Sequence, residues 1–89
     1  MRRAEASIVN KLGLHARPSA KITQVASKFR AEVWMTKGAR RINAKSIMGV
    51  MMLAAAKGAV VVIEADGPDE EEAVAALCAL IAAGFDEEL

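Results

Sequence analysis

Residues 59–83 read AVVVIEADGPDEEEAVAALCALIAA, and this stretch decides the fold. Three consecutive valines and an isoleucine near its start predict a well-buried strand over 59–65. Asp-Gly-Pro-Asp at 66–69 is a strong turn signal, and Asp69 is placed to cap a following helix, whose positive end the glutamates at 70–72 complement. We expect the buried stripe of this helix to carry Val74, Leu77, Cys78 and Ile81.

The rest of the chain supplies partners for this strand and helix. From the amino terminus, the expected elements are a strand over 4–8, an amphipathic helix over 16–28, a hairpin of strands over 32–37 and 40–43, and a short helix over 47–53. Ser46 is placed to be the N-cap of the short helix. This order in 89 residues predicts one α+β domain, residues 1–89, with helices on one face of one sheet. The pattern leaves the strand order open.

Charge is divided unevenly along the chain. All 12 basic residues lie at or before Lys57 together with only two acids, Glu5 and Glu32, whereas the other nine acids follow. Residues 1–57 therefore carry +10 and residues 58–89 carry −9, although the whole chain carries only +1. The basic part could suit a nucleic acid, but aromatic residues make up only 3% of the chain and tyrosine is absent. Too few aromatic side chains are present to stack on bases, so we expect no nucleic-acid partner.

The sequence also argues against disulfide-bonded, zinc-binding and membrane-spanning proteins. Cys78 is the only cysteine, so no intramolecular disulfide can form, which fits a reducing cytoplasm. One histidine and one cysteine cannot make a standard zinc site, and we expect neither a metal nor a cofactor. The longest apolar run, residues 73–83, is far shorter than the ~20 residues that span a bilayer. We expect a cytoplasmic monomer that does not insert into membranes.

The only histidine, His15, lies within residues 13–20, which read GLHARPSA. It falls at the predicted start of a helix, where unpaired backbone N–H groups and the helix dipole form an anion site. Gly13 permits an unusual backbone conformation, and Pro18 is tolerated in a first helical turn. Arg17 adds a planar cation whose donors match phosphate oxygens. These features suit an imidazole that accepts a phosphoryl group, whereas a histidine that only caps a helix would leave its neighbours unexplained.

This segment resembles the active-site segment of HPr, the histidine-containing phosphocarrier family of the bacterial phosphoenolpyruvate:sugar phosphotransferase system. Residues 43–53, NAKSIMGVMML, look like the family's regulatory-serine segment, and residues 65–73, ADGPDEEEA, resemble its lead into the last helix. The three motifs occur in order across essentially the whole chain, which makes the resemblance specific. It implies an open-faced β-sandwich, β-α-β-β-α-β-α, whose four-stranded antiparallel sheet is covered on one face by three helices.

The resemblance implies a phosphocarrier, not an enzyme that turns over substrate alone. His15 would accept a phosphoryl group on Nδ1 from phospho-enzyme I, which obtains it from phosphoenolpyruvate, and would pass it to an enzyme IIA domain. Arg17 would stabilise the phosphoryl charge during transfer. Where an HPr serine kinase/phosphorylase exists, Ser46 would be phosphorylated, and the added charge would weaken docking of acidic partners.

A docking surface is expected on the first helix and the short helix. We expect Val50 and Leu53 to point inward and Met52 to fill a gap under the sheet, while the other methionines stay partly exposed, since such surfaces adapt to several partners. The proposed docking patch consists of Ala16, Ala20, Lys21, Gln24, Ile47, Met48, Gly49 and Met51.

Two alternative functions remain open. The first is a regulatory paralogue that uses the same phosphohistidine chemistry in a nitrogen-related branch, since residues 82–88, AAGFDEE, resemble that branch. The second is a binding module without phosphoryl transfer. Such a module would be expected to lack the active histidine, which this chain has at position 15.

Overall fold

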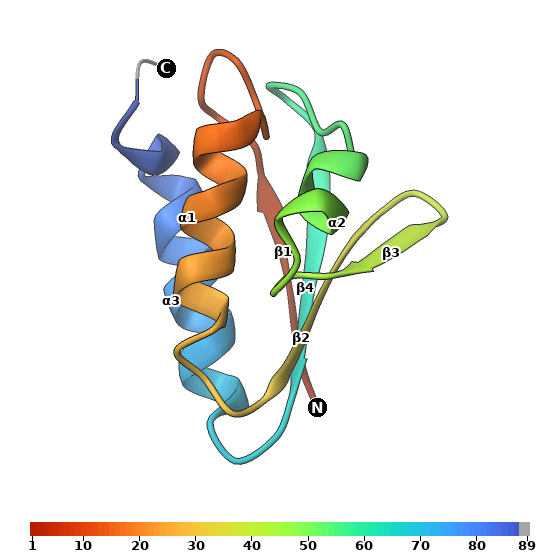
Figure 1. The fold of residues 1–89 in the computed structure, drawn as a ribbon, viewed down its shortest axis with the longest axis vertical. Helices are drawn as coiled ribbons and strands as arrows, with labels where there is room; N and C mark the ends of the chain where they lie inside the picture. Colours follow the sequence, from red (N-terminus) through yellow and green to blue (C-terminus); the bar gives the residue numbers. More distant parts are fainter. Residues whose placement is uncertain (88–89) are drawn as a thin grey trace.

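The computed structural model describes residues 1–87, which form one sheet and the helices that pack on it (Figure 1). The elements are β1 (Arg2–Ser7), α1 (Ala16–Ala26), β2 (Glu32–Lys37), β3 (Arg40–Asn43), α2 (Ile47–Met52), β4 (Val60–Asp66), α3 (Glu70–Ala82) and the short 3-10 helix η1 (Gly84–Asp86). Every expected element is present in the expected order, and both hairpin strands have the predicted bounds. Helix η1 was not predicted. No helix within residues 1–87 has the length and apolarity needed to cross a membrane.

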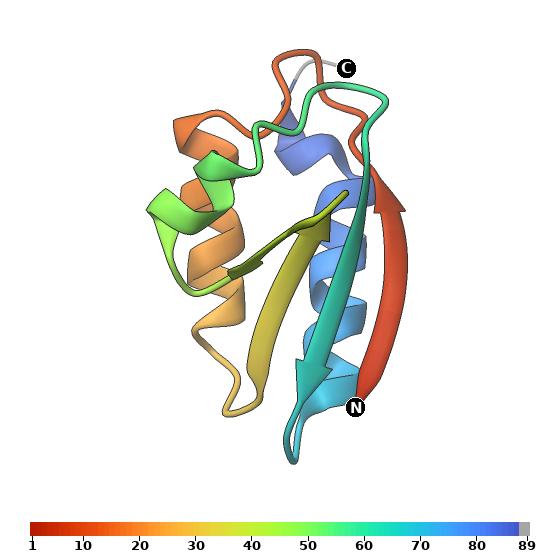
Figure 2. The ribbon, with the colours of Figure 1, turned by 90° about the vertical axis from the view of Figure 1, so that its right-hand side faces the viewer.

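The four strands are ordered β1-β4-β2-β3, and every neighbouring pair is antiparallel. Strand β4 therefore lies between the amino-terminal strand and the hairpin, with Ala6 opposite Val61 and Met35 opposite Ile63. Figures 1 and 2 together show α1, α2 and α3 on one side of this sheet. The α+β open-faced sandwich with a four-stranded antiparallel sheet is confirmed.

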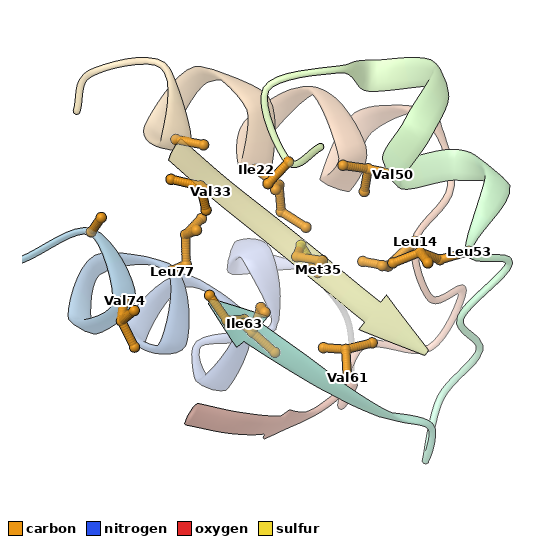
Figure 3. Close-up of a cluster of buried hydrophobic side chains, with 14 of the residues drawn as sticks. Leu14, Ile22, Val33, Met35, Val50, Leu53, Val61, Ile63, Val74 and Leu77 are labelled. Carbon is orange, nitrogen blue, oxygen red and sulfur yellow. The ribbon is translucent and has the colours of Figure 1, made fainter. Parts of the chain in front are cut away.

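The core lies between the sheet and the helices. Alternate residues of β2 and β4 point toward the helices, as the period of two in a strand requires. Figure 3 shows these side chains clustered with Ile22 of α1 and Leu77 of α3, and Val50 of α2 belongs to the same buried cluster. The fully buried strand residues are Val33, Met35, Val61, Ile63 and Ala65.

Two expectations about burial were wrong. Met52 was expected under the sheet, but it is 54% exposed, because the six-residue helix α2 has one buried position, Val50, and the chain then turns inward only at Leu53. Cys78 was expected in the core stripe of α3, but it is half-buried and borders a groove between α3 and the edge strand β1. Partial burial raises the pKa of the Cys78 thiol. The rest of that stripe, Val74, Leu77 and Ile81, is buried.

Asp69 occupies the N-cap position of α3, but its side chain does not cap that helix. Its carboxylate accepts the backbone N–H groups of Arg30 and Ala31, each at 2.9 Å, and so joins the α1–β2 loop to the start of α3. Glu70 instead turns back and accepts the backbone N–H of Gly67 at 3.1 Å. The predicted turn is present, but the Asp69 carboxylate binds the α1–β2 loop and does not cap α3.

This loop contact predicts a pH-dependent stability. The hydrogen bond from Arg30 is the main cause that lowers the pKa of Asp69 below its ordinary value of 3.8. The ionised carboxylate therefore stabilises the fold above that value, and the contribution disappears as the pH falls through the lower folded-state pKa. We expect Asp69→Asn to lower the melting temperature near neutral pH and the difference from wild type to shrink below about pH 4. Thermal unfolding, followed by circular dichroism across this pH range, measures the difference in melting temperature between the two proteins. A difference that does not change with pH contradicts the role given to the Asp69 carboxylate.

Candidate functional site

His15 is the N-cap residue of α1, with φ −80° and ψ −169°. Its backbone carbonyl accepts the N–H of Ser19 at 3.0 Å, which starts the helix. Its side chain makes no capping bond, so the imidazole is left for other contacts. The histidine thus lies at the positive end of an eleven-residue helix, as the sequence predicted.

The loop before His15 is held against the segment that follows α2. Leu14 donates its backbone N–H to the carbonyl of Ala55 at 2.9 Å, and the Leu14 side chain is buried. Gly13 has φ +66° and packs on Ala55 and Ala56 so closely that a Cβ atom would lie 2.4 Å from the Ala55 oxygen. Because glycine alone fits this conformation without strain, Gly13 fixes the path of the chain into the histidine.

Glu87 lies against the imidazole, a contact that the sequence analysis missed. Its Oε1 is 3.2 Å from Nε2 of His15, although 72 residues separate the two along the chain. The buried Asn10 donates from Nδ2 to the same oxygen at 3.2 Å and to the Gly13 carbonyl at 2.9 Å. The hydrogen bond with His15 is the main cause that lowers the pKa of Glu87, and the bond from Asn10 and the Lys21 charge add to it. No local pattern near residue 87 signals this contact.

The chain end reaches His15 because α3 stops and turns. Helix α3 ends at Ala82, close to the expected stop at Gly84, which has φ +65°. Phe85 follows, fully buried although its φ of +57° is unusual for a side chain of its size. The ammonium of Lys21 donates to the Phe85 carbonyl at 2.6 Å, which ties this turn to α1. Figure 1 shows the resulting proximity of the carboxyl-terminal turn to the start of α1.

An open hollow of about 450 Å³ lies beside the histidine. We call it the His15 hollow; it is lined by Lys11, Leu12, His15, Arg17, Asp86 and Glu87. Arg17 is exposed in the first turn of α1, and within residues 1–87 its guanidinium has neither a hydrogen bond nor an ion pair. The hollow therefore combines an imidazole, the exposed guanidinium of Arg17 and the amino-terminal end of a helix, which together can receive a phosphoryl group.

The residues expected in the docking patch differ in exposure. Ile47, Met48 and Met51 are 44%, 71% and 40% exposed, and Val50 and Leu53 point inward, as predicted. On α1, which packs beside α2, Ala16 and Gln24 are exposed and Ala20 and Lys21 are half-buried; Gly49 on α2 is also half-buried. The Lys21 ammonium is engaged with the Phe85 carbonyl, so it contributes less to the outer surface than the sequence suggested. Leu12, which the prediction omitted, is 71% exposed at the rim of the His15 hollow.

Ser46 is exposed and is the N-cap of α2, as predicted. Its Oγ accepts the backbone N–H of Gly49 at 3.1 Å, an interaction worth about 1 kcal/mol relative to alanine. The hydroxyl immediately precedes the exposed residues Ile47 and Met48, so a change of charge at Ser46 would act directly on this part of the docking patch. In the described part of the chain, no three His, Cys, Asp or Glu side chains gather as a metal site would require.

Comparisons with known proteins match this chain over nearly its whole length. Residues 2–83 fit the family model described as the PTS HPr component phosphorylation site. The phosphocarrier protein HPr of Neisseria meningitidis is 62% identical over 80 residues, 90% of each chain. The phosphocarrier protein NPr of Escherichia coli K12 is 45% identical over 82 residues, 91% of each chain.

Solved structures agree with the sequence matches. The crystal structure of HPr-C-His from Thermoanaerobacter tengcongensis superposes with a TM-score of 0.95 at 50% identity and covers all of both chains. The structure of an HPr dimer from the same organism gives a TM-score of 0.76 at 49% identity and covers 96% of this chain and 98% of that one. Sequence and fold therefore point to the same group of proteins.

Proposed function

Because the chain belongs to the HPr family of phosphocarrier proteins of the bacterial phosphotransferase system, we propose that His15 is the residue on which it carries the phosphoryl group. The donor is phospho-enzyme I, charged from phosphoenolpyruvate, and the acceptor is an enzyme IIA domain. The observation that carries this proposal is the His15 hollow, in which the imidazole lies at the start of α1 beside the exposed side chain of Arg17.

In the transfer step the lone pair of Nδ1 of His15 attacks phosphorus. The new N–P bond forms as the bond between phosphorus and the donor breaks, and the electron pair of that bond stays with the donor. The chemistry needs no further reactant, so the protein contributes position and electrostatics. Arg17 and the first N–H groups of α1 stabilise the negative charge of the phosphoryl oxygens in the transition state.

Partners are recognised through the docking patch. Its exposed apolar side chains on α2 and the exposed residues of α1 offer one surface to both enzyme I and enzyme IIA, which must present the donor or acceptor group to the same hollow. The protein acts in the cytoplasm, as a monomer, although several similar structures are those of dimers. In a cell with an HPr serine kinase, a phosphate on Ser46 adds roughly −1.5 to −2 charges next to the docking patch and weakens docking without unfolding α2.

The nitrogen branch is the second candidate function. The match to an NPr protein over 91% of the chain favours it, and both branches use the same chemistry at the histidine. The identity of 62% to an HPr protein against 45% to an NPr protein supports the sugar branch. A binding module without transfer is disfavoured by a histidine placed at a helix start beside an exposed arginine.

The direct test is incubation of the protein with enzyme I and phosphoenolpyruvate, followed by intact mass measurement under non-acidic conditions. We expect one acid-labile phosphoryl group per chain. Parallel reactions with a sugar-branch and a nitrogen-branch enzyme I separate the two candidates, since the cognate enzyme I should phosphorylate faster. No phosphoryl uptake from either one, while each phosphorylates its own carrier, contradicts the proposal.

A further inference from the structure

The side chain of Glu87 restricts where His15 can carry its proton. A carboxylate only accepts hydrogen bonds, so the 3.2 Å contact between Oε1 of Glu87 and Nε2 of His15 requires a proton on Nε2. Neutral histidine has one ring proton, and with that proton on Nε2 the lone pair is on Nδ1. Within residues 1–87 no hydrogen bond is formed to Nδ1, so the contact leaves that lone pair available.

One further contact reaches the carboxylate of Glu87, and two more fix the backbone on either side of the site. Asn10 is completely buried, and both of its amide contacts serve this site: one to Oε1 of Glu87 and one to the carbonyl of Gly13, two residues before the histidine. Lys21 fixes the Phe85 carbonyl two residues before Glu87. The loop that carries the histidine and the segment that carries the carboxylate are thus fastened to each other.

Asn10 gives an independent sign that this arrangement matters. Its Oδ1 is buried and has no hydrogen-bond partner in the described structure. An unpartnered buried oxygen is unfavourable, and turning the amide over would place this oxygen, rather than a donor, against the Glu87 carboxylate. The side chain therefore keeps its donors on Glu87 and Gly13 and leaves its acceptor unsatisfied.

From this geometry we propose that Glu87 is a positioning residue for phosphoryl transfer, holding the proton of His15 on Nε2 so that Nδ1 is the nucleophile. The inference rests on the proposed function. When Nδ1 bonds to phosphorus and Nε2 keeps its proton, the ring gains positive charge, and the carboxylate stabilises that charge. In a serine protease triad, a buried aspartate orients the histidine in the same way.

The carboxylate could also act in the opposite direction by repelling the incoming phosphoryl group. Glu87 contacts Nε2, whereas the phosphoryl group bonds to Nδ1, and the imidazolium charge lies between them. Attraction to the ring therefore acts over a shorter distance than repulsion by the phosphoryl oxygens. Removal of the carboxylate should slow the transfer.

The test compares Glu87→Gln and Glu87→Leu with wild type by two measurements. The first is the ¹⁵N chemical shifts of the His15 ring at a pH where it is neutral, which report the tautomer in the unphosphorylated protein. The second is the rate of phosphorylation by enzyme I. Asp86→Asn is the matched control, because Asp86 lines the same hollow without a hydrogen bond to His15.

In the leucine variant we expect a larger share of the Nδ1–H tautomer and a phosphorylation rate at least about tenfold lower, the smallest effect typical of losing a partner that orients a metal-bound histidine. The glutamine variant, whose amide oxygen can still accept from Nε2, should keep the tautomer and lose less of the rate. The control should keep the wild-type tautomer.

Three results overturn the inference: an unchanged tautomer in the leucine variant, an unchanged or faster rate there, or an equal tautomer change in the Asp86→Asn control. If wild type itself takes up no phosphoryl group, the proposed function fails, and the tautomer measurement still decides whether Glu87 holds the proton on Nε2.

Discussion

Replacement of His15 with alanine is expected to reduce phosphoryl uptake from phospho-enzyme I to background, a complete loss and not a graded one. The other residues of the His15 hollow are Lys11, Leu12, Arg17, Asp86 and Glu87, and none of them offers a second imidazole. The fold should survive, because the His15 side chain is 38% exposed and caps nothing. We expect stability within about 0.5 kcal/mol of wild type, as for ordinary surface substitutions.

Intact mass under non-acidic conditions measures the uptake, and circular dichroism verifies the fold. Lys28→Ala is the control, because Lys28 is exposed beyond the end of α1 and belongs neither to the lining of the hollow nor to the docking patch. It should be phosphorylated like wild type. A phosphoryl group that persists on the His15→Ala protein would place the acceptor elsewhere in the chain.

Gly13→Ala should produce the largest loss of stability among single-methyl additions at the site. The new Cβ would lie 2.4 Å from the oxygen of Ala55 and 2.9 Å from Cα of Ala56, both backbone atoms that cannot rotate away. A shift of the loop away from Ala55 would strain the hydrogen bond from Leu14 to Ala55. Because the strain of the positive φ adds to this clash, we expect the free energy of unfolding to fall by about 3 kcal/mol or more.

Gly38→Ala is the matched control. Gly38 has φ +60°, close to the +66° of Gly13, but nothing lies within 4 Å of the position of its Cβ. The free energy of unfolding of this variant should fall only by the cost of placing alanine at a positive φ, about 1–2 kcal/mol. Urea unfolding of both variants separates backbone strain from steric clash. Equal losses would show that the packing of Gly13 on Ala55 adds nothing to the strain.

The same Gly13 variant should also slow phosphorylation, because the displaced loop carries His15 and the Gly13 carbonyl that Asn10 holds. A misplacement of about 1 Å in a reacting group costs up to 100-fold in rate. Gly38→Ala, remote at the turn between β2 and β3, should leave the rate unchanged.

Sequence reasoning failed where a side chain had a choice between local and distant partners. Asp69 was read as a helix cap because its neighbours form a turn, yet the α1–β2 loop offers two N–H groups that suit a carboxylate better. Met52 and Cys78 were assigned to the interior on apolarity alone, but α2 is too short and the edge beside β1 too open to bury them. Competition between partners is decided by packing, which periodicity does not report.

By itself the sequence determined the order of the elements, the hairpin, the Ser46 cap and a histidine at a helix start next to an arginine. These follow from periodicity, turns and capping, which act over a few residues. Only the tertiary structure decided the strand order β1-β4-β2-β3 and the partners of His15. Glu87 lies 72 residues from the histidine and 77 from Asn10, and Phe85 lies 64 from Lys21. Such contacts exist because α3 packs on the sheet in one direction and returns the chain end to the start of α1.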